Sequence, residues 1–144
     1  MVETIENDGR LIAIIVTHHF EKDGITFFTP PELSQQLAYL RHPAGKTIEP
    51  HIHIPGTREV HLTQETLLIK RGKLRVDFFN DERVYVESRV LEAGDVLLLV
   101  QGGHGFEVLE EVEIFEVKQG PYKEADDKVR FAAELPAELK FRKS

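Results

Sequence analysis

The apolar residues of this chain occur in short runs rich in valine, isoleucine, leucine and phenylalanine, and glycine, proline, asparagine and aspartate separate the runs. Runs of this length and composition, bounded by turn-forming residues, are typical of β-strands. The candidate strands are residues 11–16, 25–28, 37–41, 66–69, 74–79, 84–90, 96–100, 106–109 and 112–117. So many short strands in one chain predict an all-β sandwich, jelly roll or small barrel.

Turn signals between the runs indicate antiparallel neighbours. Arg71-Gly72 and Asn80-Asp81-Glu82 each separate two strand-like runs, which predicts two hairpins. Helical patterns are weak, and we expect only peripheral helical turns at 31–36 and 136–141. The N-terminal strands are expected to add to a sheet edge or to a partner subunit. Because proteins usually cover exposed strand edges, we expect a homodimer.

Length and composition favour one soluble domain. The chain has 144 residues, of which 41% are hydrophobic and 30% charged, as in an ordinary globular domain. A formal net charge of -7 without a basic cluster argues against a nucleic-acid partner, which would need lysine and arginine to neutralise phosphates. No run approaches the roughly 20 apolar residues of a membrane span, and the first residues do not resemble a signal peptide. We therefore expect a cytoplasmic protein without membrane partners.

The histidines carry the strongest chemical signal. With no cysteine in the chain, any transition metal would need histidine, aspartate, glutamate or a neutral oxygen as ligand. His51 and His53 flank one isoleucine, and residues two apart on a strand face the same side. If this segment is a strand, both imidazoles point into one interior. Further along the chain, Glu65 precedes a strand-like run, and His104 follows a glycine turn.

These residues resemble the two sequence motifs of the cupin superfamily over about residues 36–118. The first motif is matched by Gly45, His51, His53, Glu65 and Gly72, and the second by Gly94, Asp95, Gly102 and His104. The resemblance implies a cupin-type antiparallel β-barrel of the jelly-roll kind. Residues 1–144 would form a single cupin domain, with the N- and C-terminal extensions packing on the barrel core.

The resemblance also implies one divalent metal ion bound by His51, His53, Glu65 and His104. Imidazole and carboxylate ligands suit Fe, Mn, Ni or Zn without selecting among them. The gap between His53 and Glu65 is longer than in the motif, so that Glu59 or His61 could replace Glu65 as the ligand. The same two residues are the candidates for a catalytic general base.

Two strand positions outside the motifs have more than one interpretation. Tyr39 and Arg41 are two apart and share a face, where they could line the mouth of a substrate pocket or lie on the solvent side of an edge strand. Glu116 and Lys118 share a face of the last strand. We interpret them as an exposed ion-pair face rather than as groups that reach the interior.

The closing stretch, residues 114–122, resembles the end of WbuC-type small cupin metalloproteins, which are associated with surface-polysaccharide gene clusters. This favours a metalloenzyme of carbohydrate metabolism that acts on a small oxygen-bearing molecule, such as a carbohydrate derivative or a carboxylic or keto acid, by oxygenation or isomerisation. The alternatives are a metal-dependent binding module without turnover and a metal-free sugar-nucleotide epimerase or isomerase, in which the histidines transfer protons.

Overall fold

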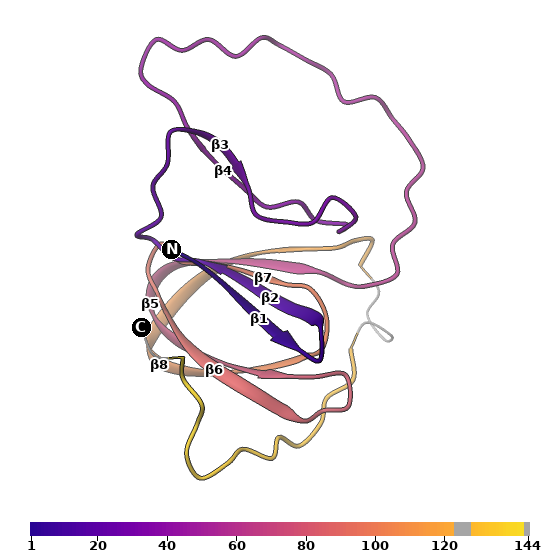
Figure 1. Ribbon diagram of the computed structural model, residues 1–144, viewed down its shortest axis with the longest axis vertical. Coiled ribbons are helices and arrows are strands. Elements are labelled where there is room, and N and C mark those ends of the chain that lie inside the picture. Colours follow the sequence, from indigo (N-terminus) through magenta and orange to yellow (C-terminus); the bar gives the residue numbers. More distant parts are fainter. Residues whose placement is uncertain (123–127, 143–144) are drawn as a thin grey trace.

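A computed structural model describes residues 1–122 and 128–142, and within this part of the chain the regular structure consists of β-strands without a helix (Figure 1). The strands are β1 (Val2–Asn7), β2 (Arg10–Val16), β3 (Gly24–Phe27), β4 (Ala38–Arg41), β5 (Glu65–Phe79), β6 (Tyr85–Glu92), β7 (Val96–Leu99) and β8 (Gly103–Lys118). The all-β prediction is confirmed. Accordingly, no described element is a helix long and apolar enough to cross a membrane.

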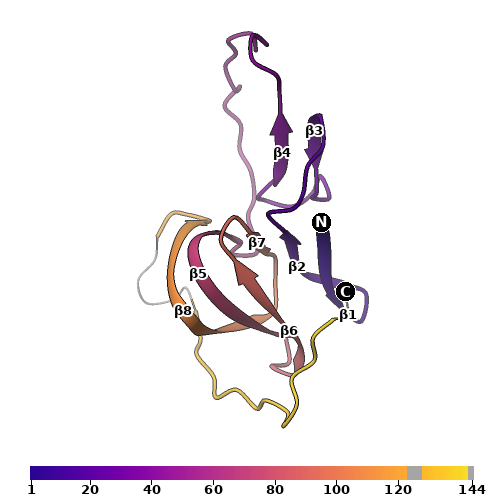
Figure 2. The same cartoon turned by 90° about the vertical axis from the view of Figure 1, so that its left-hand side faces the viewer.

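Six strands form one strongly curled antiparallel sheet that has the shape of a half-barrel (Figure 2). The order is β1-β2-β7-β5-β6, and β8 pairs along the other side of β5. The strand β1, which was not among the strands predicted from the sequence, lies at a sheet edge and pairs only with β2 in the described chain. The two remaining strands, β3 and β4, form a separate two-stranded ribbon.

The curled sheet is apolar on both faces, because strand residues alternate between them. On β7, Leu97 and Leu99 belong to the large core cluster on the concave face, whereas Leu98 belongs to a smaller cluster on the outer face. The concave cluster comprises Ile5, Ile12, Ala13, Ile15, Leu67, Ile69, Leu74, Val76, Phe78, Leu91, Leu97 and Leu99. A continuous apolar run such as β7 is therefore a strand buried on both sides.

The hairpin predicted at Arg71-Gly72 is wrong. The chain continues through these residues as one 15-residue strand, β5, which pairs with the 16-residue β8 over its whole length. Irregularities in the β5–β8 register near Arg71 and Lys73 absorb the extra residues, and Gly72 takes a positive φ of 92° there. Glycine thus marks a β-bulge inside a strand and not a turn between two strands.

The turn predicted after β5 is confirmed. The carbonyl of Val84 accepts a hydrogen bond from the Asn80 backbone N–H at 2.9 Å, and the Asn80 side-chain oxygen accepts from Glu82 and Val84. The side-chain carbonyl of this asparagine thus serves the backbone N–H groups of the β5–β6 turn as a backbone carbonyl would. The helical turns predicted at 31–36 and 136–141 are absent, and these segments form a bend and an extended stretch.

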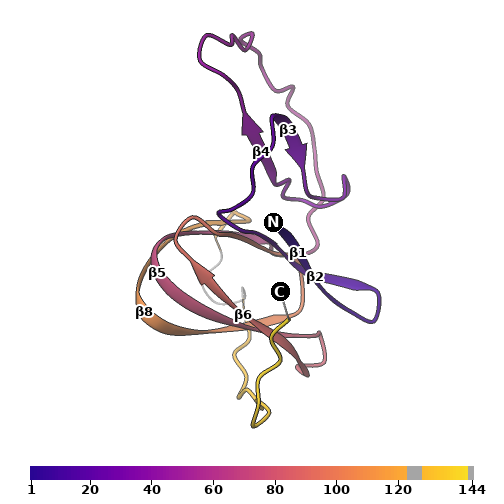
Figure 3. The ribbon, with the colours of Figure 1, turned by 60° about the vertical axis from the view of Figure 1, so that its left-hand side comes forward.

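The ribbon and the segment that follows it stand away from the sheet (Figure 3). Residues 42–64, between β4 and β5, contain no strand and are mostly exposed. The C-terminal stretch instead returns to the sheet, where Phe141 forms an isolated parallel bridge with Ser88 of β6. The concave face is therefore uncovered on the side of β8, where the described chain gives that strand no second neighbour.

Candidate functional site

The concave face carries polar side chains at the two ends of β5 and β8, and the sheet curls enough for the charge of Glu116 to act on His104. Pairing across these strands sets Leu67 opposite Glu116 and Phe78 opposite His104. Because Leu67 and Phe78 belong to the concave core, and directly opposed residues share a face, Glu116 and His104 also lie on that face. Glu65, two residues before Leu67, completes the group.

Glu65 is half-buried beside a second carboxylate. Burial, a hydrogen bond with Glu116 and the negative charge of Glu116 together raise the pKa of Glu65 from its usual value of 4.5 to about 7. The positive charges of Lys118 and Lys128 oppose this effect. Two carboxyl groups that share one hydrogen bond hold a proton at neutral pH because both cannot ionise cheaply in a half-buried position.

His104 is kept in its neutral form. Burial lowers the pKa of His104, Lys128 acts in the same direction, and the negative charge of Glu116 acts against both. Its ring lies 5.3 Å from the ring of Phe106, the next residue of β8 on the concave face. A neutral imidazole can accept a proton or donate its lone pair to a metal ion.

The surroundings of this group are apolar and open. Phe106, Val108 and Ile114 lie on the concave face of β8 in register with core residues of β5, yet each is exposed. Exposed large apolar side chains next to a few polar groups are typical of a surface that binds a ligand or another chain segment. Glu65, Glu116 and His104 thus share the concave face with exposed apolar side chains of β8.

His51 and His53 lie elsewhere. Both are on the projecting segment, exposed, with ring centroids 5.3 Å apart, and the His51 ring nitrogen is 3.0 Å from the Glu49 carbonyl. The predicted strand around them is absent, so their proximity comes from the local chain and not from a pleated face. The structure does not bring them to Glu65 and His104. Over the described residues, no three His, Asp or Glu side chains form a group that could hold a metal ion.

The remaining candidates also lie away from the concave face. Glu59 and His61 are exposed on the projecting segment, 3.6 Å apart. Tyr39 is on β4, with its ring packed edge-on against Phe20 at 4.9 Å. Arg41, also on β4, forms long ion pairs of 3.9 and 3.6 Å with Glu21 and Asp23.

The sequence interpretation missed the partner of Glu116. Glu116 is exposed, as expected, but its carboxyl group also bonds to that of Glu65. The sequence contains one relevant signal: Glu116 is two residues from Ile114, so the two share a face. Its partner could not be read from the sequence, because the β5–β8 register joins residues about fifty positions apart through irregularities.

Comparison of the chain with protein-family models, with curated proteins and with solved structures gave no match. The interpretation of the site therefore depends on its own residues.

The raised pKa of Glu65 predicts a pH dependence for the metal-free protein. A carboxyl group whose pKa is higher in the folded than in the unfolded state stabilises the fold below pH 4.5, and this stabilisation is lost as the pH rises to about 7. We expect Glu65→Gln to remove this loss. Between pH 5 and pH 8 the free energy of unfolding of the wild type should fall by about 1 kcal/mol more than that of the variant, since the group is only half-buried. Urea unfolding at the two pH values measures this difference, and an equal change in wild type and variant would contradict the raised pKa of Glu65.

Proposed function

We propose that this protein is a metal-binding protein of the cupin type that acts on a small oxygen-bearing molecule at the concave face of β5 and β8. The observation that carries the proposal is the group Glu65, Glu116 and His104, which presents two carboxyl groups and a neutral imidazole on one open face. Oxygen and imidazole nitrogen are suitable ligands for Fe, Mn, Ni or Zn. A divalent cation would replace the proton that the two carboxyl groups retain.

The donor set on the concave face supplies only part of a metal site, and the projecting segment would supply the rest. The 16-residue β8 has one edge without a strand in the described chain, while residues 46–54 have no sheet partner. Adding this segment as a strand to that edge would satisfy backbone groups on both sides. His51 and His53 would then share the concave face with His104, and Ile52 and Ile54 would face outward. The half-barrel would thereby become a jelly-roll barrel of the cupin type.

The chemistry follows from the character of the face. A bound divalent ion would supply a Lewis acid for a substrate oxygen. Phe106 and Val108 offer apolar surface to the carbon part of the substrate, and Lys118, which lies opposite Glu65, offers a positive charge to a carboxylate or a similar group. A carbohydrate derivative or a carboxylic or keto acid has both features. The proposed reaction is the oxygenation or isomerisation of such a substrate. This reaction would belong to carbohydrate metabolism in the cytoplasm.

A second candidate function uses the same residues without a metal ion. A carboxyl group with a pKa of about 7 and a neutral histidine on the same face form an acid and a base. This favours an epimerase or isomerase that transfers protons. The two functions differ in whether activity survives removal of every metal ion.

Elemental analysis of the untagged protein tests the first proposal. We expect near-stoichiometric metal in the wild type, and its loss in both His104→Ala and His51→Ala, because each variant removes one ligand from a different part of the chain. His42→Ala, at the start of the same projecting segment, is the matched control and should retain the metal. Metal that is lost in His61→Ala but kept in Glu65→Gln would transfer the ligand role to His61.

The metal proposal would be contradicted by a wild-type protein that is metal-free and also fails to take up added Fe, Mn, Ni or Zn. The acid–base function would then remain. Strand addition has its own readout in hydrogen exchange. Amide protection of residues 46–54 should rise when the metal is added, because their backbone N–H groups would then lie at or within a sheet.

A further inference from the structure

The outer face of the curled sheet is covered over only part of its area. Over β2 and β7 it is covered by the segment of residues 20–37, whose Phe20, Phe28, Leu33 and Leu37 pack on the outer cluster. Beside this cluster, Leu68 of β5 and Phe115 and Val117 of β8 also face outward, because Leu68 pairs with Phe115 and alternates with the buried Leu67. These three side chains, the outer strip, are uncovered.

The ribbon carries a second uncovered apolar surface. Ile25 lies opposite Leu40 in the β3–β4 register, and Phe27 is two residues from Ile25, so these three side chains share one face. We call them the ribbon face. The other face of the ribbon carries Tyr39, which packs on Phe20. The six side chains of the outer strip and the ribbon face are between 41% and 64% exposed. Exposed apolar side chains that cluster in this way, unlike scattered ones, indicate an interaction surface.

The ribbon cannot simply fold down onto the outer strip of its own chain, because its base is fixed. The Phe28 backbone N–H donates to the Leu37 carbonyl at 3.0 Å, and the ring of Phe28 packs edge-on against Phe20 at 5.0 Å. Thr66 of β5 donates to the side chain of Gln35 at 2.8 Å. These contacts hold the segment over β2 and β7 while the ribbon face points away. Figures 1 and 2 show the ribbon beyond the end of the half-barrel, apart from β5 and β8.

We propose that the ribbon face of one copy packs on the outer strip of a second copy, and that the reciprocal contact closes a symmetric dimer. Both surfaces are on one chain, so a two-fold axis pairs them twice and leaves neither exposed. Six side chains that are about half exposed offer roughly 100 Å² each, or about 600 Å² per copy, which approaches the about 800 Å² per partner of a standard interface.

The charges beside the two surfaces are complementary. Lys70 is two residues from Leu68 and therefore also lies on the outer face. It is exposed, and its ammonium nitrogen lies 5.7 Å from the centre of the Phe115 ring. Glu21 and Asp23, just before the ribbon, are exposed acids that form long ion pairs with Arg41. In the dimer they would approach the Lys70 of the other copy and favour this pairing over a contact between two ribbons. The proposal does not depend on metal binding.

Sedimentation velocity over a concentration series tests the dimer. We expect the wild type to sediment with twice its mass of 16.5 kDa. Phe27→Glu on the ribbon face and Phe115→Glu on the outer strip should each raise the dissociation constant at least about 100-fold, because a charge in an apolar contact costs several kcal/mol. Val84→Glu, at an equally exposed valine in the β5–β6 hairpin, is the matched control and should remain dimeric. Thermal unfolding of each variant shows whether the fold is intact.

Mixing the two variants identifies which surfaces meet. Phe27→Glu retains an intact outer strip and Phe115→Glu an intact ribbon face, so an equimolar mixture should form a mixed dimer that neither variant forms alone. A monomeric wild type would overturn the proposal. So would a dimer that survives Phe27→Glu, which indicates strip-to-strip packing, or one that survives Phe115→Glu, which indicates ribbon-to-ribbon packing.

Discussion

Replacing Gly72 with alanine is expected to lower the free energy of unfolding by at least about 3 kcal/mol. Gly72 lies at the β-bulge where β5 passes β8, with a φ of 92°. A Cβ atom there would lie 2.0 Å from the Glu111 carbonyl oxygen and 2.9 Å from the Val112 Cα. All of these atoms belong to the backbone of the paired strand, so relief requires that the two longest strands separate.

Gly9→Ala is the matched control for this substitution. Gly9 also has a positive φ, of 77°, in the two-residue turn between β1 and β2, but a Cβ atom there would meet nothing within 4 Å. We expect a loss of only about 1 kcal/mol, which is the cost of the left-handed backbone alone. Urea unfolding followed by circular dichroism compares the two variants. If Gly72→Ala is no less stable than Gly9→Ala, the close approach of β8 at this bulge is refuted.

The sequence predicts the strands of this fold better than their connections. Local composition was sufficient to place most of the strands, because short apolar runs mark them even in β3, β4 and β8, where no residue is buried. Gly72 was interpreted as a turn, since a glycine between two apolar runs signals a hairpin. A bulge produces the same local pattern, and only the partner strand, about forty residues further on, distinguishes the two.

The candidate site also depends on pairing between strands that are distant in the sequence, which local patterns do not show. Glu65 and His104 lie on one face of the curled sheet, near opposite ends of the β5–β8 pair, and their role as metal ligands stays a prediction. Glu116 is exposed, as expected, but its hydrogen bond with Glu65 was not predicted, because alternation gives a face but not the neighbour across the strands. For His51 and His53 the strand that would orient them is absent from the described structure, so the metal site remains a prediction with its own test.

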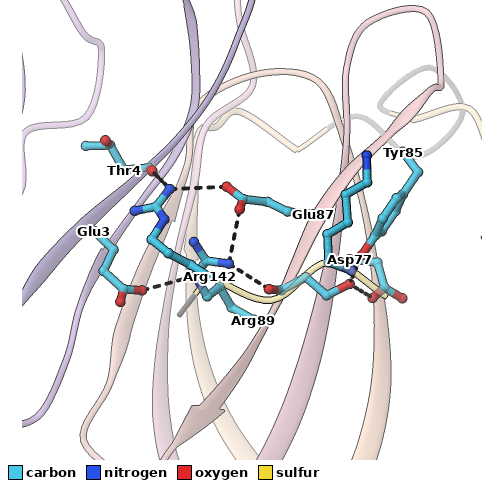
Figure 4. Close-up of polar contacts among 9 residues, drawn as sticks. Glu3, Thr4, Asp77, Tyr85, Glu87, Arg89 and Arg142 are labelled. Carbon is cyan, nitrogen blue, oxygen red and sulfur yellow. Dashed lines mark hydrogen bonds and ion pairs between the residues drawn. The ribbon is translucent and has the colours of Figure 1, made fainter. Parts of the chain in front are cut away.

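The C-terminal stretch is fastened to the sheet by a buried polar network, part of which is shown in Figure 4. Asp77 is buried and accepts two hydrogen bonds from Arg75, at 3.0 and 2.9 Å, and one from the Ser88 hydroxyl at 2.6 Å. Ser88 in turn bonds to the Tyr85 hydroxyl, which accepts from the Lys140 backbone N–H at 3.0 Å. The carboxylate of Asp77 therefore supports both an arginine and the docking of the last residues.

Further contacts hold the same stretch beside β1 and β6. Arg142 donates to the Thr4 carbonyl at 2.7 Å and to Glu87 at 3.3 Å, and Glu87 also pairs with Arg89 at 3.2 Å. Arg89 reaches Glu3 as well, at 3.2 Å (Figure 4). The Arg142 pair with Glu87 is partly exposed and contributes little by itself, whereas the Arg89–Glu87 pair is about as buried as Arg75–Asp77. The stability of the network therefore depends mainly on its two buried pairs, Arg75–Asp77 and Arg89–Glu87.

Asp77→Ala is expected to cost about 3–5 kcal/mol, because it leaves the largely buried guanidinium of Arg75 and the fully buried Ser88 without their acceptor. Glu107→Ala is the matched control. It removes the other ion-pair partner of the same arginine, at 2.6 Å, but Glu107 is more than half exposed, so we expect a loss below about 1 kcal/mol. Thermal and urea unfolding measure both variants. Equal losses would show that burial of the carboxylate does not set its contribution. A greater loss for Asp77, with faster amide exchange at Ser88 and Lys140, would show that the network also fastens the C-terminal stretch.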